Sequence, residues 1–528
     1  MSQNEERKCG TSADHDHIKN LTKIGVALSG EKNIDRLLEM ILDEARKFTN
    51  ADGGTLYIMS DDETELLFAI IQNDSLGVHM GGTGGKITWP AVKLKNADGS
   101  PNYSNVSAYV AISGEAVNIA DVYDADGFNF EGTKKFDQDR GYRSQSMLVV
   151  PMRDHENEII GVLQLLNAQD QATGAVVNFS LESQEMTLSL ASQAAVALTN
   201  NRLISDLENL LESFIKTIAT AIDEKSLYTG GHVRRVAQLT MTIANKINEK
   251  KQGPFASVIF SEDQMRELRM AAWLHDVGKI TTPEHVVDKS TKLEKVYDRI
   301  SDVKTRFELL KREYQLAMQE TKNNKVGNSP EKMEREIKIL DEEYQFLVQV
   351  NRGSEFIKDE MIERIKKIGK RKWRTNSQTL PLLTEDEIYN LSVRRGTLND
   401  EERNIINNHA AVSYKMLSGL PFPKKMRHIA DYAAAHHEKL DGTGYPLGLK
   451  ADQLFLQSRI IAIADIFEAL TAKDRPYKKG KTVAEALKIM ELMVKDQHID
   501  ADLYELFIKE KIYTDYARRE LAPQQIDA

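Results

Sequence analysis

The sequence contains very little cysteine. Among 528 residues there is a single one, Cys9. A lone cysteine excludes an intramolecular disulfide and any metal site built on thiolates. A metal bound by this chain must therefore be held by histidine, aspartate and glutamate side chains.

Long hydrophobic runs and low-complexity composition are also absent. No run of about 18 apolar residues occurs, and residues 1–17 are polar, without the hydrophobic region of a signal peptide. The 30 glycines and 12 prolines are too few for a fibrous or low-complexity chain. These absences predict a cytoplasmic protein with a disordered stretch over residues 1–17 and no membrane insertion.

Strong charge of one sign is missing as well. The 70 basic and 80 acidic residues give a formal net charge of −10, which argues against binding to polymeric nucleic acid or to anionic membranes. Hydrophobic residues make up 41% of the chain, enough for several cores. At about 150 residues per domain, the length predicts three or four structural units.

The N-terminal region, residues 18–200, has the pattern of an α+β unit. Apolar residues from Ile34 to Phe48 recur every three or four positions, which predicts a helix capped by Asn33. The segment 53–74 predicts two strands around a Ser-Asp-Asp turn. We therefore expect an antiparallel sheet flanked by helices. Further strands are predicted at Ala116–Asp121, Ser146–Met152 and Ile159–Asn167.

Two stretches predict long helices outside this unit. Residues 181–222 carry a near-heptad apolar stripe, which fits a connecting helix that pairs with a copy of itself or, alternatively, one that packs on its own sheet. Residues 291–392 are dense in Lys, Glu and Arg and predict an antiparallel helical hairpin around a Gly-Asn-Ser-Pro turn. We assign no chemistry to this charged stretch.

Histidines and buried acids concentrate in two helical regions, 223–290 and 393–528. Asp276 and Asp465 each follow apolar helical residues, where a carboxylate is costly unless it is paired or bound to metal. One such histidine alone would more often be an ordinary core or surface residue, but the combination predicts a carboxylate-bridged divalent metal site suited to Fe, Mn or Zn. The histidines concerned are His232, His275, His409, His436 and His437.

The adjacent His436 and His437 constrain the local backbone. Neighbouring side chains point about 100° apart on a helix. Both imidazoles can therefore face one site only near the end of a helix or at a position between two metals, and the downstream glycines Gly442 and Gly444 are consistent with a helix end.

Three motifs, occurring in order, closely resemble the HD-GYP phosphodiesterases of the HD hydrolase superfamily, which hydrolyse cyclic dinucleotides, chiefly cyclic di-GMP. They are HDVGK at 275–279, HHEKLDGTGYP at 436–446 and DRPYK at 474–478. The resemblance covers 223–290 and 393–510. It implies an all-α catalytic domain over 223–528, in which 291–392 is an insertion.

The resemblance also implies roles for individual residues. Two divalent metals, Fe or Mn, would be bridged by Asp276. Lys279 would contact the scissile phosphate or help protonate the leaving oxygen, so Asp276 and Lys279 are the candidate catalytic residues. The implied metal ligands are His232, His275, Asp276, His409, His436, His437 and Asp465.

Substrate contacts are implied in two further segments. Arg475 and Lys478 would bind substrate phosphate. A loop would shape the site and a surface for signalling partners, and it contains Asp441, Gly442, Gly444, Tyr445 and Pro446.

Three positions depart from the family pattern. Tyr228 stands where some relatives have a Glu that holds a third metal, which favours two metals here. Glu468 stands where an Asp is common, and DRPYK comes one residue late, with Lys473 as the extra residue.

Residues 18–200 resemble a GAF domain, a small-molecule sensor. The resemblance rests on NADGGTLYIM at 50–59, SGEAVNIADVYDAD at 113–126 and the segment 146–167. A loose match to the pattern of cyclic-nucleotide-binding GAF domains is interpreted instead as a surface turn, and the ligand stays open. The residues of that match are Asn129, Lys134, Lys135, Phe136, Asp137 and Asp139.

Together these resemblances imply a homodimeric, GAF-regulated phosphodiesterase that hydrolyses cyclic di-GMP to linear pGpG, with GMP as a further end product left open. Two metals about 3.5–4 Å apart would lower the pKa of a water between them and hold the phosphodiester oxygens. One alternative is an enzyme for another cyclic dinucleotide, such as 3',3'-cyclic GMP–AMP. Another is an inactive scaffold that relays a signal through protein contacts. Hydrolysis of monomeric nucleotides is disfavoured by the loop at 441–446.

Overall fold

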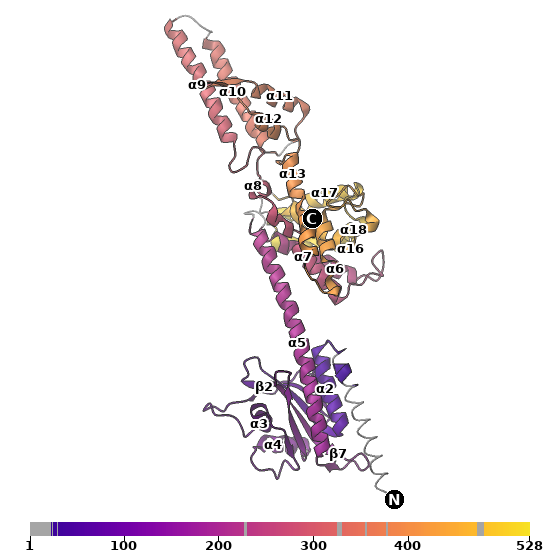
Figure 1. Cartoon of the computed structure of the whole chain (residues 1–528). Coiled ribbons are helices and arrows are strands. Elements are labelled where there is room, and N and C mark those ends of the chain that lie inside the picture. Colours follow the sequence, from indigo (N-terminus) through magenta and orange to yellow (C-terminus); the bar gives the residue numbers. More distant parts are fainter. Residues whose placement is uncertain are drawn as a thin grey trace. The chain divides into compact units, whose positions relative to one another are not determined.

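A computed structural model describes residues 23, 25–28, 30–225, 230–324, 330–353, 356–375, 378–472 and 480–527. The chain divides into two compact units, Met1–Leu210 and Leu211–Ala528 (Figure 1). The predicted disorder of residues 1–17 lies outside the described residues.

The N-terminal unit contains an antiparallel sheet in the order β3-β2-β1-β7-β6-β5, with β4 paired to β2 and β8 to β7. The predicted α+β architecture is thereby confirmed. The strands are β1 (Ala51–Met59), β2 (Glu65–Asn73), β3 (Val78–Gly81), β4 (Val92–Lys93), β5 (Val117–Ile119), β6 (Met147–Arg153), β7 (Ile159–Gln169) and β8 (Val176–Val177).

Helices cover both faces of this sheet. The helices are α2 (Ile34–Thr49), α3 (Val106–Ser113) and α4 (Glu131–Arg140), together with the first part of α5 (Leu181–Asp223). On one face, Leu37 and Ile41 of α2 pack with Leu165 of β7 and with Ala194 of α5. The Asn33 side chain caps α2, as predicted, by accepting the Arg36 N–H at 3.0 Å.

Helix α5 packs on its own sheet over its first part, which is one of the two arrangements that the sequence left open; pairing with a second copy stays a prediction. Up to Leu198, its apolar side chains are buried against its own sheet. Ile215 and Ile222, near its other end, are buried in the core of the C-terminal unit. Between these segments the apolar stripe is exposed, at Leu203, Ile204, Leu207, Leu210 and Phe214.

The C-terminal unit is helical, as predicted. Its core packs α6, α7, α15 and α16 together through residues such as Val236, Leu268, Ile429 and Ile463. The α-helices outside the insertion are α6 (His232–Asn248), α7 (Glu262–Leu274), α8 (Glu284–Val287), α13 (Asp400–Asn407), α14 (His409–Ser418), α15 (Ile429–Ala434), α16 (Leu456–Thr471), α17 (Val483–Lys495), α18 (Ala501–Lys509) and α19 (Tyr513–Glu520). The 3₁₀ turns are η1 (Val277–Thr281), η2 (Lys424–Met426), η3 (Ala435–His437), η4 (Ala451–Gln453) and η5 (Pro523–Gln525).

The charged stretch between α8 and α13 has a core of its own. Helices α9 (Ile300–Asn324) and α10 (Pro330–Asn351) pack against each other, and Lys311 of α9 binds Asp341 of α10 at 2.8 Å. Of the predicted Gly-Asn-Ser-Pro turn, Pro330 is the first residue of α10, and the other three residues lie outside the described residues. Three further elements were not expected from the sequence: α11 (Asp359–Gly369), the ribbon β9 (Lys372–Arg374) with β10 (Thr379–Pro381), and α12 (Glu385–Leu391).

Within the described residues, no helix is both long enough and apolar enough to cross a lipid bilayer. The cytoplasmic location stays a prediction of the sequence.

The segment 128–139, expected to be a surface turn, forms most of α4 instead. Asp137 is buried because its carboxylate accepts the Ser144 N–H at 2.8 Å, the Ser144 hydroxyl at 3.0 Å and the Tyr123 hydroxyl at 3.1 Å. Two of these bonds tie α4 to the segment that enters β6, and the third ties it to Tyr123, in the segment that follows β5. Asp137 is therefore structural, and the sequence pattern could not show which neighbours would satisfy it.

We expect Asp137→Ala to destabilise the N-terminal unit by about 1–3 kcal/mol, because a buried N–H and hydroxyl lose their acceptor. Differential scanning calorimetry of the full chain measures the effect. Asp139→Ala, at an exposed position of the same helix, is the control. Equal shifts for the two variants would contradict the structural role.

Candidate metal centre

Five separate elements or junctions bring the seven predicted ligands together. Two ligands open helices: His232 is the first residue of α6 and His409 is the first residue of α14. Asp465 lies in the middle of α16. The other four lie where helices end, His275 and Asp276 directly after α7 and His436 and His437 in η3.

The two imidazoles at 436 and 437 face the same site because the backbone tightens there. Helix α15 ends at Ala434 and continues as a 3₁₀ turn, which places the two ring centroids 3.9 Å apart. The predicted helix end is thereby confirmed.

The Asp276 carboxylate lies between two groups of imidazoles. Its Oδ2 atom is 3.4 Å from His232 Nε2 and 3.3 Å from His275 Nε2. Its Oδ1 atom is 3.2 Å from His409 Nε2. Asp465 joins the first group, with Oδ1 3.3 Å from His232 Nε2. A carboxylate that offers one oxygen to each side has the arrangement of a bridging ligand.

Two clusters of potential ligand atoms result. His232, His275 and Asp276 form one, and His409, His436 and His437 form the other. Within each cluster the ligand atoms lie within 4.8 Å of one another. The clusters share Asp276 through the contact of its Oδ1 atom with His409.

Several ligand atoms are buried without a hydrogen bond among the described residues: His275 Nε2, Asp276 Oδ1, His409 Nε2 and His436 Nε2. The contacts of 3.2–3.4 Å around Asp276 lack the alignment of a hydrogen bond. Leaving such atoms unpaired in a protein interior is costly. Divalent cations bound in the two clusters would satisfy these four atoms, so the residues fit a metal centre.

The Nδ1 atoms of three ligand histidines explain why their Nε2 atoms are available to bind a metal. Nδ1 of His275, His409 and His436 lies 2.8, 2.6 and 2.6 Å from the carbonyl oxygen of the residue three positions earlier. These carbonyls lie in the last turns of α7, α13 and α15, where the helix leaves carbonyl groups without an intrahelical partner. A carbonyl only accepts, so Nδ1 carries the proton and Nε2 keeps its lone pair for a metal.

The protonation states of His436 and His437 also suit a metal. Burial lowers the pKa of the His436 imidazole well below its usual value, and burial lowers the pKa of His437 to about 3. Both rings are therefore neutral. Burial would raise the pKa of Asp276, but Lys279 and His275 outweigh it and hold that pKa well below the ordinary range.

His232 is oriented by a carboxylate instead of a carbonyl. Its Nδ1 atom lies 2.5 Å from Glu468 Oε2, and Glu468 Oε1 accepts the Arg235 Nε–H at 2.7 Å. From the sequence, Glu468 was identified only as a departure from the family pattern, and no role was predicted for Arg235. The sequence did contain a signal for Arg235: this basic residue lies on the face of an amphipathic helix that also buries Val233 and Val236.

Lys279 also reaches the centre. Its Nζ atom lies 2.5 Å from Asp276 Oδ2. Gly278 allows η1 to pack closely on α14, because a Cβ at this position would lie 2.0 Å from the His409 carbonyl oxygen.

The loop at 441–446 folds back onto the centre. The Tyr445 ring centroid lies 4.9 Å from that of His437. Gly444 cannot carry a side chain, because its Cβ would lie 2.4 Å from the Lys439 nitrogen. Asp441 fixes the turn by accepting the Thr443 N–H and hydroxyl, both at 2.8 Å.

Glu438 anchors the far side of this loop, a role that the sequence did not suggest. Its buried carboxylate accepts the N–H groups of Leu447, Gly448 and Leu449 at 2.6–3.1 Å. Gly442, with a φ of 81°, lies in the turn that Asp441 fixes, and Pro446 directly precedes the segment that Glu438 holds.

Four positions singled out in the sequence lie outside the described residues: Tyr228, Lys473, Arg475 and Lys478. Their predicted roles stay predictions.

We expect Glu468→Gln to weaken metal binding about 10–100-fold, because removing a carboxylate that orients a ligand histidine has effects of that size. Metal content after dialysis at defined free metal, measured by elemental analysis, tests this. The control is Asp431→Asn, which disturbs a histidine–carboxylate pair outside the centre, Asp431 with His428 at 3.0 Å. Equal losses in the two variants would contradict the orienting role.

Three family models match the chain. A GAF domain model matches residues 33–198. Two HD domain models match residues 229–343 and 381–503.

Curated relatives match part of the chain. A 3'3'-cGAMP-specific phosphodiesterase of Vibrio cholerae is 46% identical over 97 residues, which are 18% of this chain and 20% of that protein. A cyclic di-GMP phosphodiesterase of Pseudomonas aeruginosa is 37% identical over 114 residues, 22% and 26% of the two chains. A cyclic di-GMP phosphodiesterase of Thermotoga maritima is 36% identical over 129 residues, 24% and 34%. The chain thus spans at most about a third of the length of these relatives.

The family models and the relatives agree with the motifs and the geometry of the centre. This chain carries an N-terminal GAF domain and a C-terminal HD domain, and the predicted resemblance to the HD-GYP group is confirmed.

Proposed function

We propose that the chain is a metal-dependent phosphodiesterase that hydrolyses cyclic di-GMP to linear pGpG under the control of its GAF domain. The observation that carries this proposal is a set of four buried atoms that have no hydrogen-bond partner among the described residues: Asp276 Oδ1 and the Nε2 atoms of His275, His409 and His436. The names of the relatives supply the substrate class.

Two divalent metals, Fe or Mn, are proposed to occupy the centre. Nitrogen and oxygen ligands suit these ions, and the two clusters that meet at Asp276 provide a place for each. When bound, such metals supply Lewis-acid activation of water and of the phosphodiester. The proposed ligands are His232, His275, Asp276, His409, His436, His437 and Asp465.

The remaining site residues supply positive charge and shape. Lys279 places a cation 2.5 Å from Asp276, where it can neutralise charge that develops on the scissile phosphate or protonate the leaving oxygen. Arg475 and Lys478 are proposed to hold substrate phosphate. The loop from Asp441 to Pro446 is proposed to border the substrate, since Tyr445 packs on His437.

A second candidate substrate is 3',3'-cyclic GMP–AMP, because one of the relatives is named as specific for it. The two dinucleotides differ in one base and share both phosphodiesters. A preference between them depends on contacts with the bases.

We expect the full chain, loaded with Mn²⁺ or Fe²⁺, to convert cyclic di-GMP to pGpG, with GMP formation followed in the same chromatograms. Asp276→Asn should abolish turnover, because it removes the charge shared by the two clusters. His285→Gln, at an exposed histidine of the same unit, should leave turnover unchanged.

The substrate panel separates the alternatives. Cleavage of 3',3'-cyclic GMP–AMP with cyclic di-GMP intact would select the second candidate. A protein that binds metal but leaves every cyclic dinucleotide intact would be a scaffold.

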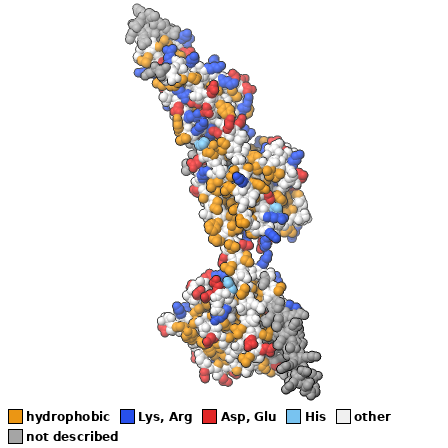
Figure 2. All heavy atoms as spheres, in the orientation of Figure 1, with side chains coloured by type: hydrophobic (Ala, Val, Ile, Leu, Met, Phe, Trp, Pro, Cys, Tyr) orange, Lys and Arg blue, Asp and Glu red, His pale blue; other side chains and the backbone are white. Residues whose placement is uncertain are grey.

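We also propose that the chain forms a parallel homodimer through α5. The exposed part of this helix has the spacing of a coiled-coil seam, with Leu203 and Leu210 at one core position and Leu207 and Phe214 at the other. Asn200 occupies the same core position as Leu207, where a polar residue fixes register and strand number. Figure 2 shows hydrophobic side chains gathered along α5.

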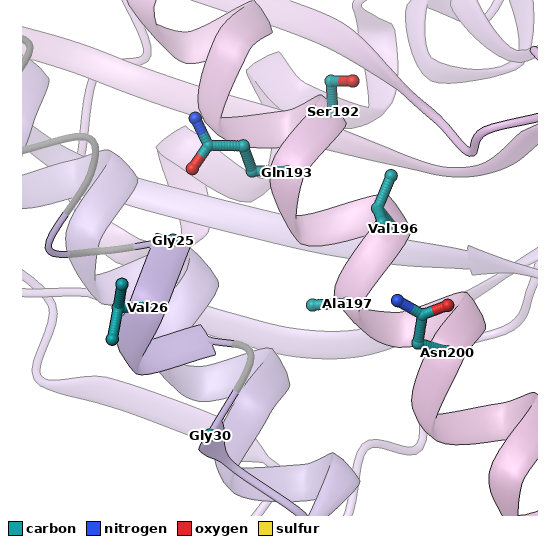
Figure 3. A pocket seen from close by; sticks show the side chains of 8 residues that line it. All are labelled: Gly25, Val26, Gly30, Ser192, Gln193, Val196, Ala197 and Asn200. Carbon is teal, nitrogen blue, oxygen red and sulfur yellow. The ribbon is translucent and has the colours of Figure 1, made fainter.

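The seam continues onto the N-terminal unit as a hollow of about 700 Å³. Figure 3 shows that Gly25, Val26 and Gly30 line one side and α5 the other. The α5 residues are Ser192, Gln193, Val196, Ala197 and Asn200. Mostly small side chains leave room for a helix of a second copy.

A cysteine pair tests the dimer directly. In a Cys9→Ser background, Leu207→Cys should form an intermolecular disulfide under mild oxidation, because equivalent core positions face each other in a parallel, in-register pair. Ser205→Cys, two residues away on the outer face, should not. Non-reducing gel electrophoresis reads both out, and equal cross-linking or a monomer by light scattering would contradict the arrangement.

A further inference from the structure

The helical insertion joins the HD domain through two buried lysines. The side chains of Lys289 and Lys292 are fully buried where the chain enters the insertion. Lys292 Nζ donates to the carbonyl oxygens of Leu391 and Val393, where the chain leaves it, at 3.1 and 2.6 Å. Lys292 therefore links the segment that enters the insertion to the segment that leaves it.

Lys289 belongs to a closed buried group of four residues, here the Lys289 network: Lys289, Asn390, Asn399 and Glu402. Lys289 Nζ lies 2.7 Å from both carboxylate oxygens of Glu402 and 3.3 Å from Asn390 Oδ1. Asn399 Nδ2 donates to the same Asn390 oxygen at 3.1 Å. The network therefore connects the entry, the last helix of the insertion and the segment that follows it.

The same residues begin the helix that leads to a metal ligand. Asn399 and Glu402 form the capping box of α13, with hydrogen bonds of 2.9 and 3.0 Å. Near the end of α13, the Ile406 carbonyl oxygen accepts from His409 Nδ1 at 2.6 Å. The carbonyl that sets the ring of His409 thus belongs to a helix whose first turn is held by Lys289.

A second contact links α13 to the other side of the centre. The chain that carries Lys279 continues through α8 to Lys289, and α8 contacts α13 (Figure 1). The Lys289 carbonyl also accepts the Thr397 hydroxyl at 3.0 Å. A shift of α13 would therefore move His409 relative to the segment that carries Lys279, α8 and Lys289.

We propose that the Lys289 network is a positioning device for His409, through which the helical insertion sets the metal affinity of the centre. Lys289 and Glu402 are positioning residues, since neither reaches the ligand atoms. The inference rests on the metal centre of the proposed function but not on its substrate. It makes the insertion part of the machinery of the HD domain.

The insertion contains a matched pair for comparison. Glu387 occupies the same capping-box position in α12 as Glu402 does in α13, with Thr384 as its partner. It binds Arg306 Nη1 at 2.8 Å and Nη2 at 2.5 Å, and both side chains are largely buried. Among the described residues, no hydrogen bond of Glu387 or Arg306 reaches α13 or a metal ligand.

The experiment compares Glu402→Gln with Glu387→Gln in the full, chelator-stripped chain. Mn²⁺ alone is titrated in, and free Mn²⁺ is read by electron paramagnetic resonance. We expect Glu402→Gln to raise the Kd about tenfold or more, in line with other outer-shell changes, and Glu387→Gln to stay within twofold of the wild type. Both variants should lower the Tm.

Two lysine variants keep the inference testable if one glutamine variant fails to fold. Lys289→Met should raise the Kd as Glu402→Gln does, and Lys289→Arg, which keeps the charge, should restore most of the affinity. Equal shifts for Glu402→Gln and Glu387→Gln, or an unchanged Kd in a folded Glu402→Gln protein, would overturn the proposal.

The comparison of Mn²⁺ Kd values does not depend on which substrate the protein cleaves. A wild-type protein that binds Mn²⁺ but cleaves no cyclic dinucleotide contradicts the proposed activity and leaves the Kd comparison valid. A wild-type protein that binds no Mn²⁺ overturns the centre and this inference with it.

Discussion

The buried carboxylate of Asp276 is the constraint on which the C-terminal unit depends. It is 4% exposed, and one of its oxygens has no hydrogen bond among the described residues. An isolated ionised carboxylate in an apolar interior is strongly unfavourable, so its surroundings must supply positive charge. Lys279, imidazoles on both sides and a proposed pair of metals meet that requirement. The helices of the unit are arranged so that their ends deliver those groups.

Helix ends are well suited to this task. A helix leaves carbonyl groups unpaired in its last turn, and three ligand histidines use such carbonyls to fix their rings. His232 is the first residue of α6, and its ring is not oriented by a carbonyl of the described residues. It is held instead by Glu468, which Arg235 balances in charge. One centre thus uses two different solutions to the same problem of ring orientation.

The insertion and α5 extend this organisation in different ways. The insertion has its own core, yet the buried network of Lys289 returns its ends to the helix that precedes His409. Helix α5 begins in the core of the GAF unit and ends in the core of the HD unit. Its exposed apolar residues lie between those two buried segments, where neither core covers them.

Much of the fold and of the candidate metal centre could be predicted from the sequence. Helical spacing predicted α2, which buries one face, and short apolar runs between turns predicted strands β1, β2, β5, β6 and β7, of which β1 and β6 are buried on both faces. The ordered motifs predicted the HD-type domain and all seven candidate ligands, and the adjacency of His436 and His437 favoured a helix end. The seven-residue helix α12 and the β9–β10 ribbon were missed because short segments carry too few residues to show a period. Helix α11 was missed although Ile362, Ile365 and Ile368 recur at helical spacing.

Chain order by itself therefore determined which residues are available to bind metal. It could not determine that Asp276 lies between the two imidazole groups, or that Glu468, Arg235, Glu438 and Lys289 hold the ligands and loops in place. Those contacts join residues separated by up to 236 positions. The partner of a buried polar group depends on which helix ends pack together, and only the tertiary structure decides that.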